Sequence, residues 1–445
     1  MFSKKIQLTL KKSLLIGMST ASLVAGLLSG SVQTVEADAL DIDSEASITV
    51  DHDTGQILQG EAIDDTLGIA SMTKMLVEYI VHEEIDAGNL DWETEITISD
   101  YAYGISQNYA LSNVALREGG TYTLKELYDA MAIYSANGAT IAIAEHIAGS
   151  EPEFVDRMNE LVESFGVTDA TIVNSTGLNN SSLQGEIYPE SSETDENMMS
   201  ARSSAIVVNH LLQDYPEILE VASIPEQTFR PDTVDAVQMI NWNWMLEGLS
   251  HERPGVDGLK TGTTDFAGAT FAGTATEGDR RLITVVLNAG DFTDKSSRFV
   301  ETDTMMDFGF NEWESVNVTD QWAEVYEYEP IQVTNGQEDT VDFEPSESLD
   351  MLMQLDDSVE EDVTYTVEWN SDIVTEEGSV HAPFDEGMEI GRLVVDYSGN
   401  EHGFLEDEQG DSVPLVTSNA VEQAGIFSRA WSWVAGVFES IAGRF

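Results

Sequence analysis

Val256-Asp257-Gly258-Leu259-Lys260-Thr261-Gly262 opens the stretch of sequence whose pattern decides the fold. From this point apolar and polar residues alternate, which predicts strands over 259–263, 267–275 and 281–289. Short turns that contain Asp or Gly separate these strands, so we expect an antiparallel meander. A helix predicted over 297–308 would pack on the meander. The pattern therefore predicts an α/β fold in which helices flank an antiparallel sheet.

The chain before this sheet is predicted to begin with a hairpin and a helix. Two short strands are expected within 46–60, on either side of the turn-rich sequence 51–55. Apolar residues spaced by three and four predict a helix over 70–85, and Ser71 would lie in its first turn.

Three more helices are expected before the sheet, and together they predict a helical subdomain. The turn-forming sequence Ser135-Ala136-Asn137-Gly138 interrupts this region, which predicts that Ser135 and Asn137 lie on a loop. Residues 179–199 are polar and acid-rich, and we expect them to form a surface segment at the rim of a cleft. The predicted helices span 124–134, 139–147 and 201–212.

After the first unit the pattern changes to that of an all-β domain. We place the first domain at 38–318 and a small β-rich domain at 322–416. Alternating segments at 363–369, 373–380 and 392–397 are the predicted strands of the second domain.

Both ends of the chain carry segments of a different kind. Four lysines precede the uncharged stretch 14–28, and Val35-Glu36-Ala37 follows it, which is typical of a secretory signal peptide over 1–37. An uncleaved membrane anchor is the alternative. Residues 421–445 have the pattern of an amphipathic helix with an aromatic face, which predicts a helix in the membrane interface. Docking of this helix on the protein itself is the alternative there.

Charge is the unusual feature of the composition. The chain holds 82 acidic and 19 basic residues, a formal net charge of −63, which excludes nucleic-acid binding. Repulsion on this scale destabilises a compact state unless salt screens it, so we hypothesise a halophilic protein, with acidic solubility as the alternative. There is no cysteine, which excludes disulfides and thiolate ligands, and the scattered histidines predict neither a metal site nor a cofactor.

Lysine is scarce after the leader, and two of the four remaining lysines lie in short motifs. One motif is Ser71-Met72-Thr73-Lys74, in which residues three apart share a helix face, so the Lys74 amine can reach the Ser71 hydroxyl. A serine hydroxyl needs a base to become a nucleophile, and a lysine desolvated near another cation can lose its proton and fill that role. The pair predicts a serine acyl-transfer site.

Two further motifs fit the same chemistry. In Ser135-Ala136-Asn137 the hydroxyl can relay a proton and the carboxamide can hold a substrate amide. In Lys260-Thr261-Gly262 a cation and a hydroxyl can meet an anionic substrate terminus, while the glycine allows close approach to the strand.

The order and spacing of the three motifs resemble the superfamily of serine β-lactamases and penicillin-binding proteins. More closely, the chain is similar to the low-molecular-mass penicillin-binding proteins with D-alanyl-D-alanine carboxypeptidase activity, on the motifs, the 256–262 strand, the leader, the β-rich domain and the terminal helix. The resemblance implies a β-lactamase/transpeptidase-like fold, peptidoglycan stem peptides as substrates, β-lactams as inhibitors and a place on the outer face of the cell membrane.

The resemblance also implies roles for individual residues. Ser71 would be the acylated nucleophile and Lys74 its base, and the backbone N–H groups of Ser71 and Thr263 would form the oxyanion hole. The remaining implied site residues are Ser135 and Lys260 in the proton relay, Asn137 on the peptide, Thr261 and Gly262 at the strand, and Arg298 on the terminal carboxylate.

Two other functions stay open on the sequence alone. A class A-like β-lactamase needs a deacylating glutamate, and residues 193–197 imitate its spacing only loosely. A non-catalytic, penicillin-sensing or wall-binding protein is the other alternative, against which the intact Ser71 and Lys74 argue.

Overall fold

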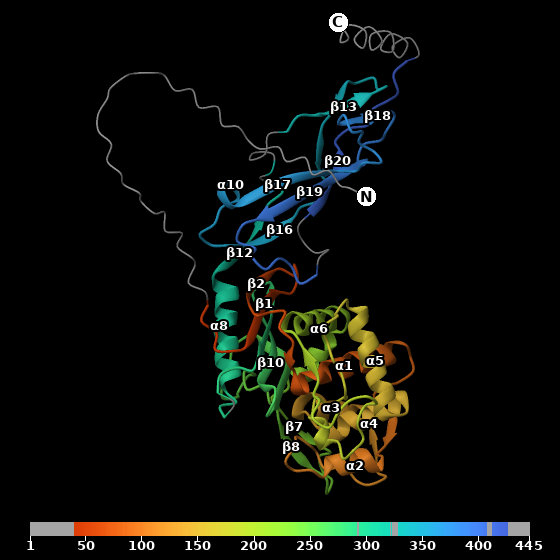
Figure 1. Ribbon diagram of the computed structural model, residues 1–445, viewed down its shortest axis with the longest axis vertical. Coiled ribbons are helices and arrows are strands. Elements are labelled where there is room, and N and C mark those ends of the chain that lie inside the picture. The colour runs from red at the N-terminus through yellow and green to blue at the C-terminus, as the bar shows by residue number, and fades with distance from the viewer. Residues whose placement is uncertain (1–39, 292, 321, 323–327, 407–411, 426–445) are drawn as a thin grey trace, which may run out of the picture.

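The computed structural model describes residues 40–291, 293–320, 322, 328–406 and 412–425 (Figure 1). An α/β unit at one end of the molecule carries a β-rich unit at the other. The predicted signal peptide 1–37 lies outside the described residues, as does the predicted helix 421–445 apart from its first five residues.

A five-stranded antiparallel sheet forms the centre of the first unit. Its order is β2-β1-β11-β10-β9, so the predicted hairpin and the predicted meander join in one sheet, in which β1 pairs with β11. Nearly every residue of β1, β10 and β11 is buried, because helices cover both faces of the sheet. The strands are β1 (Ala46–Asp51), β2 (Ile57–Glu61), β9 (Val256–Thr264), β10 (Gly268–Glu277) and β11 (Arg280–Leu287).

Helices cover the two faces of this sheet unequally. A single long helix, α8 (Ser297–Asn311), packs on β10 and β11, while α6 (Ala201–Asp214) packs on the other face and connects the sheet to the remaining helices (Figure 1). These remaining helices form the predicted helical subdomain. They are α1 (Lys74–Asp86), α2 (Asp100–Ser106), α3 (Leu124–Tyr134), α4 (Asn137–Ala148), α5 (Glu151–Ser164) and α7 (Leu219–Ala222).

Short elements complete the first unit. Three single turns of 3-10 helix are η1 (Ala70–Thr73), η2 (Asn180–Ser182) and η3 (Pro216–Ile218). Three two-stranded ribbons pair β3 (Leu67–Gly68) with β6 (Met198–Met199), β4 (Glu95–Thr97) with β5 (Thr121–Thr123), and β7 (Glu226–Phe229) with β8 (Val237–Ile240).

The second unit is mostly β among the described residues, and α10 (Val359–Asp362) is a single turn of helix in it. Its largest sheet has the order β15-β20-β19-β17, beside a three-stranded sheet β14-β13-β18 and the pair β12-β16. The strands are β12 (Trp313–Asn317), β13 (Ile331–Thr334), β14 (Thr340–Val341), β15 (Phe343–Pro345), β16 (Asp350–Gln354), β17 (Val363–Trp369), β18 (Ser379–His381), β19 (Glu389–Tyr397) and β20 (Ser412–Thr417).

One predicted strand of this unit is wrong. The alternation at 373–380 predicts a strand, but only its end, at β18, is extended. The Asn370 carbonyl instead accepts hydrogen bonds from the backbone N–H groups of Ile373 and Val374, which closes a turn. Gly378 has a positive φ of 75° and makes a second turn just before β18.

The two units share buried contacts. The Gln56 side chain, fully buried, donates to the Leu352 carbonyl at 2.8 Å and accepts from the Leu352 N–H at 2.9 Å. Leu58 and Leu282 of the central sheet belong to the hydrophobic core of the second unit. Because β12 follows α8 directly and pairs with β16, the β-rich unit begins at the end of the last helix of the first unit.

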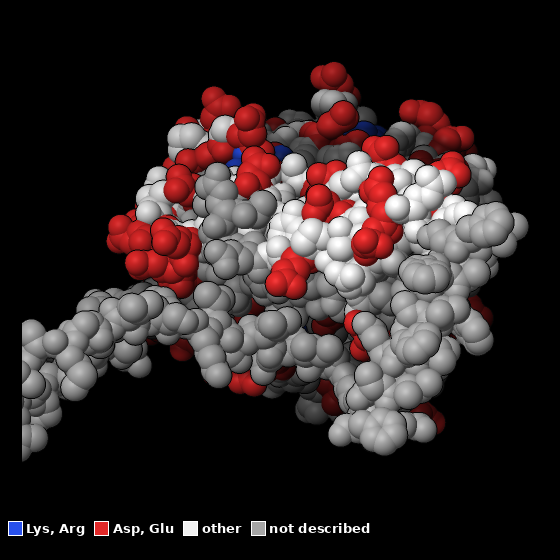
Figure 2. Space-filling view, turned by 90° about the horizontal axis from the view of Figure 1, so that it is seen from above, with Lys and Arg blue, Asp and Glu red and all other residues white. Residues whose placement is uncertain are grey.

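Acidic side chains dominate the described surface. Figure 2 shows the molecule from above, where Asp and Glu are spread over the face and few Lys or Arg are visible. In the described part of the chain, no helix combines the length and the apolar character that crossing a membrane requires.

Candidate active site

Ser71 and Lys74 meet where the 3-10 turn η1 passes into helix α1. Ser71 is the second residue of η1 and Lys74 is the first residue of α1, so the predicted helix starts with a tighter turn. The Lys74 Nζ lies 2.9 Å from the Ser71 Oγ. The amine is thus within hydrogen-bond reach of the hydroxyl, as the i, i+3 spacing predicts.

Burial makes Lys74 an unusual lysine. Its side chain is completely buried, and its Nζ donates to the Asn137 Oδ1 at 2.9 Å and to the Thr176 carbonyl at 2.6 Å. Burial lowers the pKa of Lys74 well below its ordinary value and Lys260 lowers it further, while Glu151 and Glu78 oppose these effects. A neutral amine would use its two hydrogens on the two acceptors, which leaves its lone pair for the Ser71 hydroxyl.

A second pair, Lys260 and Ser135, lies across the site from the first. The Lys260 Nζ on β9 donates to the Ser135 Oγ at 3.0 Å. Ser135 ends α3 in the left-handed conformation, with φ 57° and ψ 36°. Burial lowers the pKa of Lys260 to about 8; Glu78 acts to raise it and Arg298 to lower it.

The prediction that Asn137 lies on a loop is wrong. Asn137 is the first residue of α4, and only Ser135 and Ala136 separate α3 from α4. The Asn137 side chain donates to the Ser112 carbonyl at 3.0 Å, while its Oδ1 accepts from Lys74. These two bonds fix the carboxamide between Lys74 of α1 and the loop that carries Ser112.

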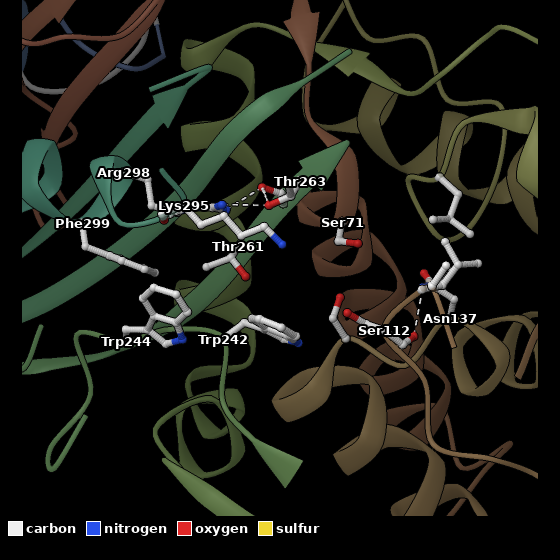
Figure 3. Close-up of a pocket in the computed structure, with 15 residues that line it drawn as sticks. Ser71, Ser112, Asn137, Trp242, Trp244, Thr261, Thr263, Lys295, Arg298 and Phe299 are labelled. Atoms are coloured by element: carbon white, nitrogen blue, oxygen red, sulfur yellow. Dashed lines mark hydrogen bonds between the residues drawn. The ribbon is translucent and has the colours of Figure 1, made fainter. Parts of the chain in front are cut away.

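Ser71 and Ser135, the serines of the two pairs, line a cavity between the helical subdomain and the edge strand β9 (Figure 3). Ser71 and Asn137 come from the helical side, and Thr261 and Thr263 come from the strand. Two tryptophans close the remaining side. The lining residues are Ser71, Ala110, Leu111, Ser112, Ser135, Asn137, Leu178, Trp242, Trp244, Thr261, Gly262, Thr263, Lys295, Arg298 and Phe299.

Arg298 lines this cavity, but its guanidinium is largely committed to the protein. It is 3% exposed, and it donates to the carbonyls of Gly262 at 2.6 Å and Thr270 at 2.8 Å and to the Thr263 Oγ1 at 2.7 Å. Burial lowers the pKa of Arg298 to about 10. These bonds fix the end of β9 and orient the Thr263 hydroxyl at the cavity wall.

Sequence reasoning missed several groups around the site. The Thr176 carbonyl carries no sequence signal, because any residue supplies a carbonyl. Glu78 follows Lys74 by one helical turn and is 3% exposed, a spacing that the sequence does contain. Lys295 could have been found from the scarcity of lysine, whereas nothing local in the sequence indicates that Trp242 lines the same cavity.

Glu151 is a further buried acid that the sequence did not reveal. Its Oε1 accepts from the Ser175 N–H at 2.9 Å and from the Ser175 Oγ at 2.6 Å, and its Oε2 accepts from the Tyr101 hydroxyl at 2.7 Å. Burial raises the pKa of Glu151, and these hydrogen bonds oppose the rise. Glu151 thereby anchors the turn whose next residue, Thr176, accepts from Lys74.

Comparison with known proteins bears on both units. Residues 31–291 match the family described as D-alanyl-D-alanine carboxypeptidase, and residues 313–423 match the penicillin-binding protein 5 C-terminal domain. The D-alanyl-D-alanine carboxypeptidase DacC of Escherichia coli is 28% identical over 445 residues, which cover 98% of this chain and 100% of the relative. DacF of Bacillus subtilis is 27% identical over 358 residues, 80% of this chain and 82% of the relative.

Solved structures agree with these relatives. The crystal structure of a peptidoglycan synthesis regulatory factor (PBP3) from Streptococcus pneumoniae is similar with a TM-score of 0.66 and 34% identity, covering 86% of this chain and 100% of the other. Penicillin-binding protein 5 from Haemophilus influenzae gives a TM-score of 0.64 at 25% identity, over 86% and 98% of the two chains. The chain therefore belongs to the D-alanyl-D-alanine carboxypeptidase family, the serine peptidases known as low-molecular-mass penicillin-binding proteins.

Proposed function

We propose that this carboxypeptidase removes the terminal D-alanine from peptidoglycan stem pentapeptides through an acyl-enzyme on Ser71, and that penicillins acylate the same serine. One observation carries this proposal. The Lys74 Nζ is 2.9 Å from the Ser71 Oγ, and a second lysine pair, Lys260 with Ser135 at 3.0 Å, belongs to the same site. Each of these buried lysines is bonded to a serine hydroxyl. Lys74 supplies the base, and Lys260 supplies the cation.

The acylation step follows from these contacts. The neutral Lys74 amine takes the Ser71 hydroxyl proton as Oγ attacks the carbonyl carbon of the penultimate D-alanine. The backbone N–H groups of Ser71 and Thr263 receive the oxyanion. Ser135 passes its hydroxyl proton to the leaving amine and takes a proton in turn from protonated Lys74, so the C–N bond breaks, D-alanine leaves and Lys74 is neutral again. Lys260 remains protonated and stabilises the negative charge that develops on the Ser135 oxygen during this transfer.

Hydrolysis completes the cycle with the same groups. Water attacks the Ser71 ester as the neutral Lys74 amine takes one of its protons. The C–O bond to Ser71 then breaks, and Lys74 returns this proton to the Ser71 oxygen. Serine and amine regain their starting protonation, and the shortened peptide leaves as a carboxylic acid. The reaction therefore needs no group beyond these side chains and water.

Substrate orientation draws on the strand side of the cavity. Asn137 faces the peptide amide, and Thr261 with Thr263 offers hydroxyls to the terminal carboxylate. Gly262 lets β9 pack closely against the chain just before Ser71, because a Cβ there would lie 2.4 Å from the Thr270 Oγ1 and 2.5 Å from the Ile69 carbonyl oxygen. Arg298 acts on the carboxylate through the Thr263 hydroxyl that it orients.

Incubation with a stem pentapeptide and with a fluorescent penicillin tests this function. Wild-type protein should release D-alanine and retain penicillin as a stable adduct, and Ser71→Ala should do neither. Rapid penicillin turnover would instead support a β-lactamase, and silence on both substrates would support a non-catalytic binder. Against a lactamase, the Glu196 carboxylate accepts from the Thr264 Oγ1 at 2.6 Å and does not line the cavity.

The pH dependence of acylation should follow the two lysines. The rate should rise with pH as Lys74 loses its proton and fall above about pH 8, because the pKa of Lys260 is lowered to about 8 and its cation is needed. Burial raises the pKa of Glu78 to about 7, so this carboxylate is charged on the alkaline limb, where it favours protonated Lys260.

Glu78→Gln should therefore move the alkaline limb to lower pH. The acid limb should move in the same direction but less, because Glu78 is the smallest of the named influences on the pKa of Lys74. Stopped-flow acylation across the pH range measures both limbs. Glu145→Gln is the matched control, since this half-buried glutamate of α4 also has a raised pKa but owes none of it to the lysines. An unmoved alkaline limb in Glu78→Gln would contradict the role given to Lys260.

The location of the protein is part of the proposal. A signal peptide over 1–37 would export the chain, and an amphipathic helix over 421–445 would hold it at the outer face of the membrane. The aromatic face of the second segment supports this, because Trp and Phe favour the membrane interface. Flotation of the mature chain with anionic lipid vesicles, with and without 421–445, tests the anchor. Equal flotation of both forms would refute it.

Stability should depend on salt, as the halophilic proposal requires. Carboxylates on the described surface outnumber the cations that could neutralise them, and at roughly 1 M salt the Debye length is only about 3 Å. The urea midpoint of unfolding should rise steadily as NaCl is increased toward that concentration. A midpoint that is already maximal at low salt would contradict the proposal and leave ordinary acidic solubility.

A further inference from the structure

Lys295 is an unneutralised cation in an acidic protein. It lies just before α8, is exposed, and lines the cavity. Across the described ranges, its ammonium group has no ion pair and no hydrogen bond, although the chain holds 82 acidic residues. The other described lysines differ, since Lys125 pairs with Asp129, and Lys74 and Lys260 are buried on serines.

The carboxylates nearest in sequence to Lys295 form hydrogen bonds within their own loop. Asp291 accepts from the N–H and the hydroxyl of Thr293, both at 2.9 Å. Asp294 accepts from the Ser296 N–H at 2.9 Å and from the Ser296 Oγ at 2.6 Å. These bonds satisfy the two flanking acids within the loop, so neither neutralises the lysine.

An aromatic ring takes the place of a counter-charge. The Lys295 Nζ lies 5.7 Å from the centroid of the Trp242 ring, within the range of a cation–π contact. In Figure 3 the Lys295 side chain extends past Thr261 into the cavity that Trp242 also lines. Such a contact holds an ammonium group without cancelling its charge, which a carboxylate would do.

The Trp242 ring is itself fixed. Its Nε1 donates to the Tyr134 carbonyl at 3.1 Å, and its ring stacks on the Tyr134 ring with centroids 6.1 Å apart and planes at 28°. Tyr134 is the last residue of α3, directly before Ser135. Trp242, and through it Lys295, is thereby held at the end of α3, next to Ser135.

We propose that Trp242 is a positioning residue that holds the Lys295 ammonium in the cavity, charged and free to meet the terminal carboxylate of the substrate. The inference rests on the proposed carboxypeptidase function. A lysine has a long flexible stem, and without the ring it would sample the acidic surface around it. Trp242 would then act through Lys295 and not by its own contact with the peptide.

A double-mutant cycle on the full mature chain tests whether Trp242 acts on the substrate through Lys295. The variants are Trp242→Leu, Lys295→Met and the two combined, with KM and kcat measured for a D-Ala-D-Ala-terminated peptide. Each single variant should raise KM about three- to tenfold with kcat nearly unchanged, the size expected for loss of one cation contact. The double variant should show no increase beyond Lys295→Met alone, and Trp242→Phe, which keeps a ring, should restore most of the wild-type KM.

Trp244→Leu is the matched control. This second tryptophan lines the same cavity but stacks with His251 and lies against Phe299, with no lysine over its ring. Its effect on KM should therefore be the same in wild type and in Lys295→Met. Equal effects of Trp242→Leu in the two backgrounds would overturn the inference. Absence of D-alanine release by the wild type would instead overturn the proposed function, so the two failures are distinguishable.

Discussion

Lys74→Met should reduce acylation of Ser71 by about 10³-fold or more, because it removes the base and leaves the cavity otherwise intact. Methionine fills nearly the same volume. Among the described residues, two groups bond to the Ser71 Oγ, the Lys74 Nζ at 2.9 Å and the Thr176 carbonyl at 3.4 Å, and of these the amine is the base. The Asn137 carboxamide and the Thr176 carbonyl would each lose one donor. The rate of labelling by a fluorescent penicillin, followed in a single turnover, measures the loss.

Lys74→Arg distinguishes the role of Lys74 as a base from its role as a positive charge. Arginine keeps a cation at this position but does not give up its proton at neutral pH, so it should be as slow as Lys74→Met. Thermal unfolding should first show that both variants are folded. A Lys74→Arg variant within tenfold of the wild-type rate would mean that Lys74 serves as a positive charge and that another group is the base.

Gly177→Ala should be the most disruptive change of a single methyl group. Gly177 has a φ of 76°, and a Cβ there would lie 1.8 Å from the Ala70 carbonyl oxygen and 2.8 Å from the Thr73 Oγ1. The turn at 174–177 thus presses directly on the peptide that precedes Ser71. We expect a loss of about 3 kcal/mol or more in the free energy of unfolding, since backbone must move against backbone.

Activity should fall with stability in Gly177→Ala, because the Thr176 carbonyl that accepts from Lys74 belongs to the same turn. Gly166→Ala is a matched control, with the same φ of 76° and no atom within 4 Å of the added Cβ. Its cost should be only the left-handed conformation itself, about 1 kcal/mol. Urea unfolding measures both, and equal losses would show that the contact with Ala70 is not critical.

Local signals explain why much of the fold could be predicted. Helix α3 has the predicted bounds, 124–134, because Thr123 and Glu126 form a capping box at its start and a left-handed residue ends it. Strand β17 likewise has the predicted bounds, 363–369, and pairs along its length with β19. Where alternation or capping is strong, the sequence alone determines the element.

One wrong prediction has its cause in contacts distant in sequence, and the other in local turns. Asn137 belongs to a turn-forming tetrapeptide, yet its side chain is satisfied by Ser112 and Lys74, so the chain can enter a helix at once. The segment 373–380 alternates like a strand but closes turns on Asn370. Periodicity does not register either effect, because both depend on partners that only the folded chain supplies.

The residues of the candidate site that belong to the three sequence motifs could be predicted. Ser71, Lys74, Ser135, Asn137 and Lys260 lie together because each motif sits on an element that faces the cavity. The Thr176 carbonyl, Trp242 and Lys295 arrive from loops, where no spacing rule connects them to the motifs. Arg298 was expected at the substrate carboxylate, and its bonds to Gly262 and Thr263 instead tie it to the strand first.

Mass spectrometry of the intact protein after brief exposure to a penicillin tests the central claim most directly. The account predicts one adduct of the mass of the antibiotic, mapped by peptide digestion to Ser71, and no adduct on Ser71→Ala. An adduct on any other residue, or the absence of an adduct on the folded wild-type protein, would contradict it.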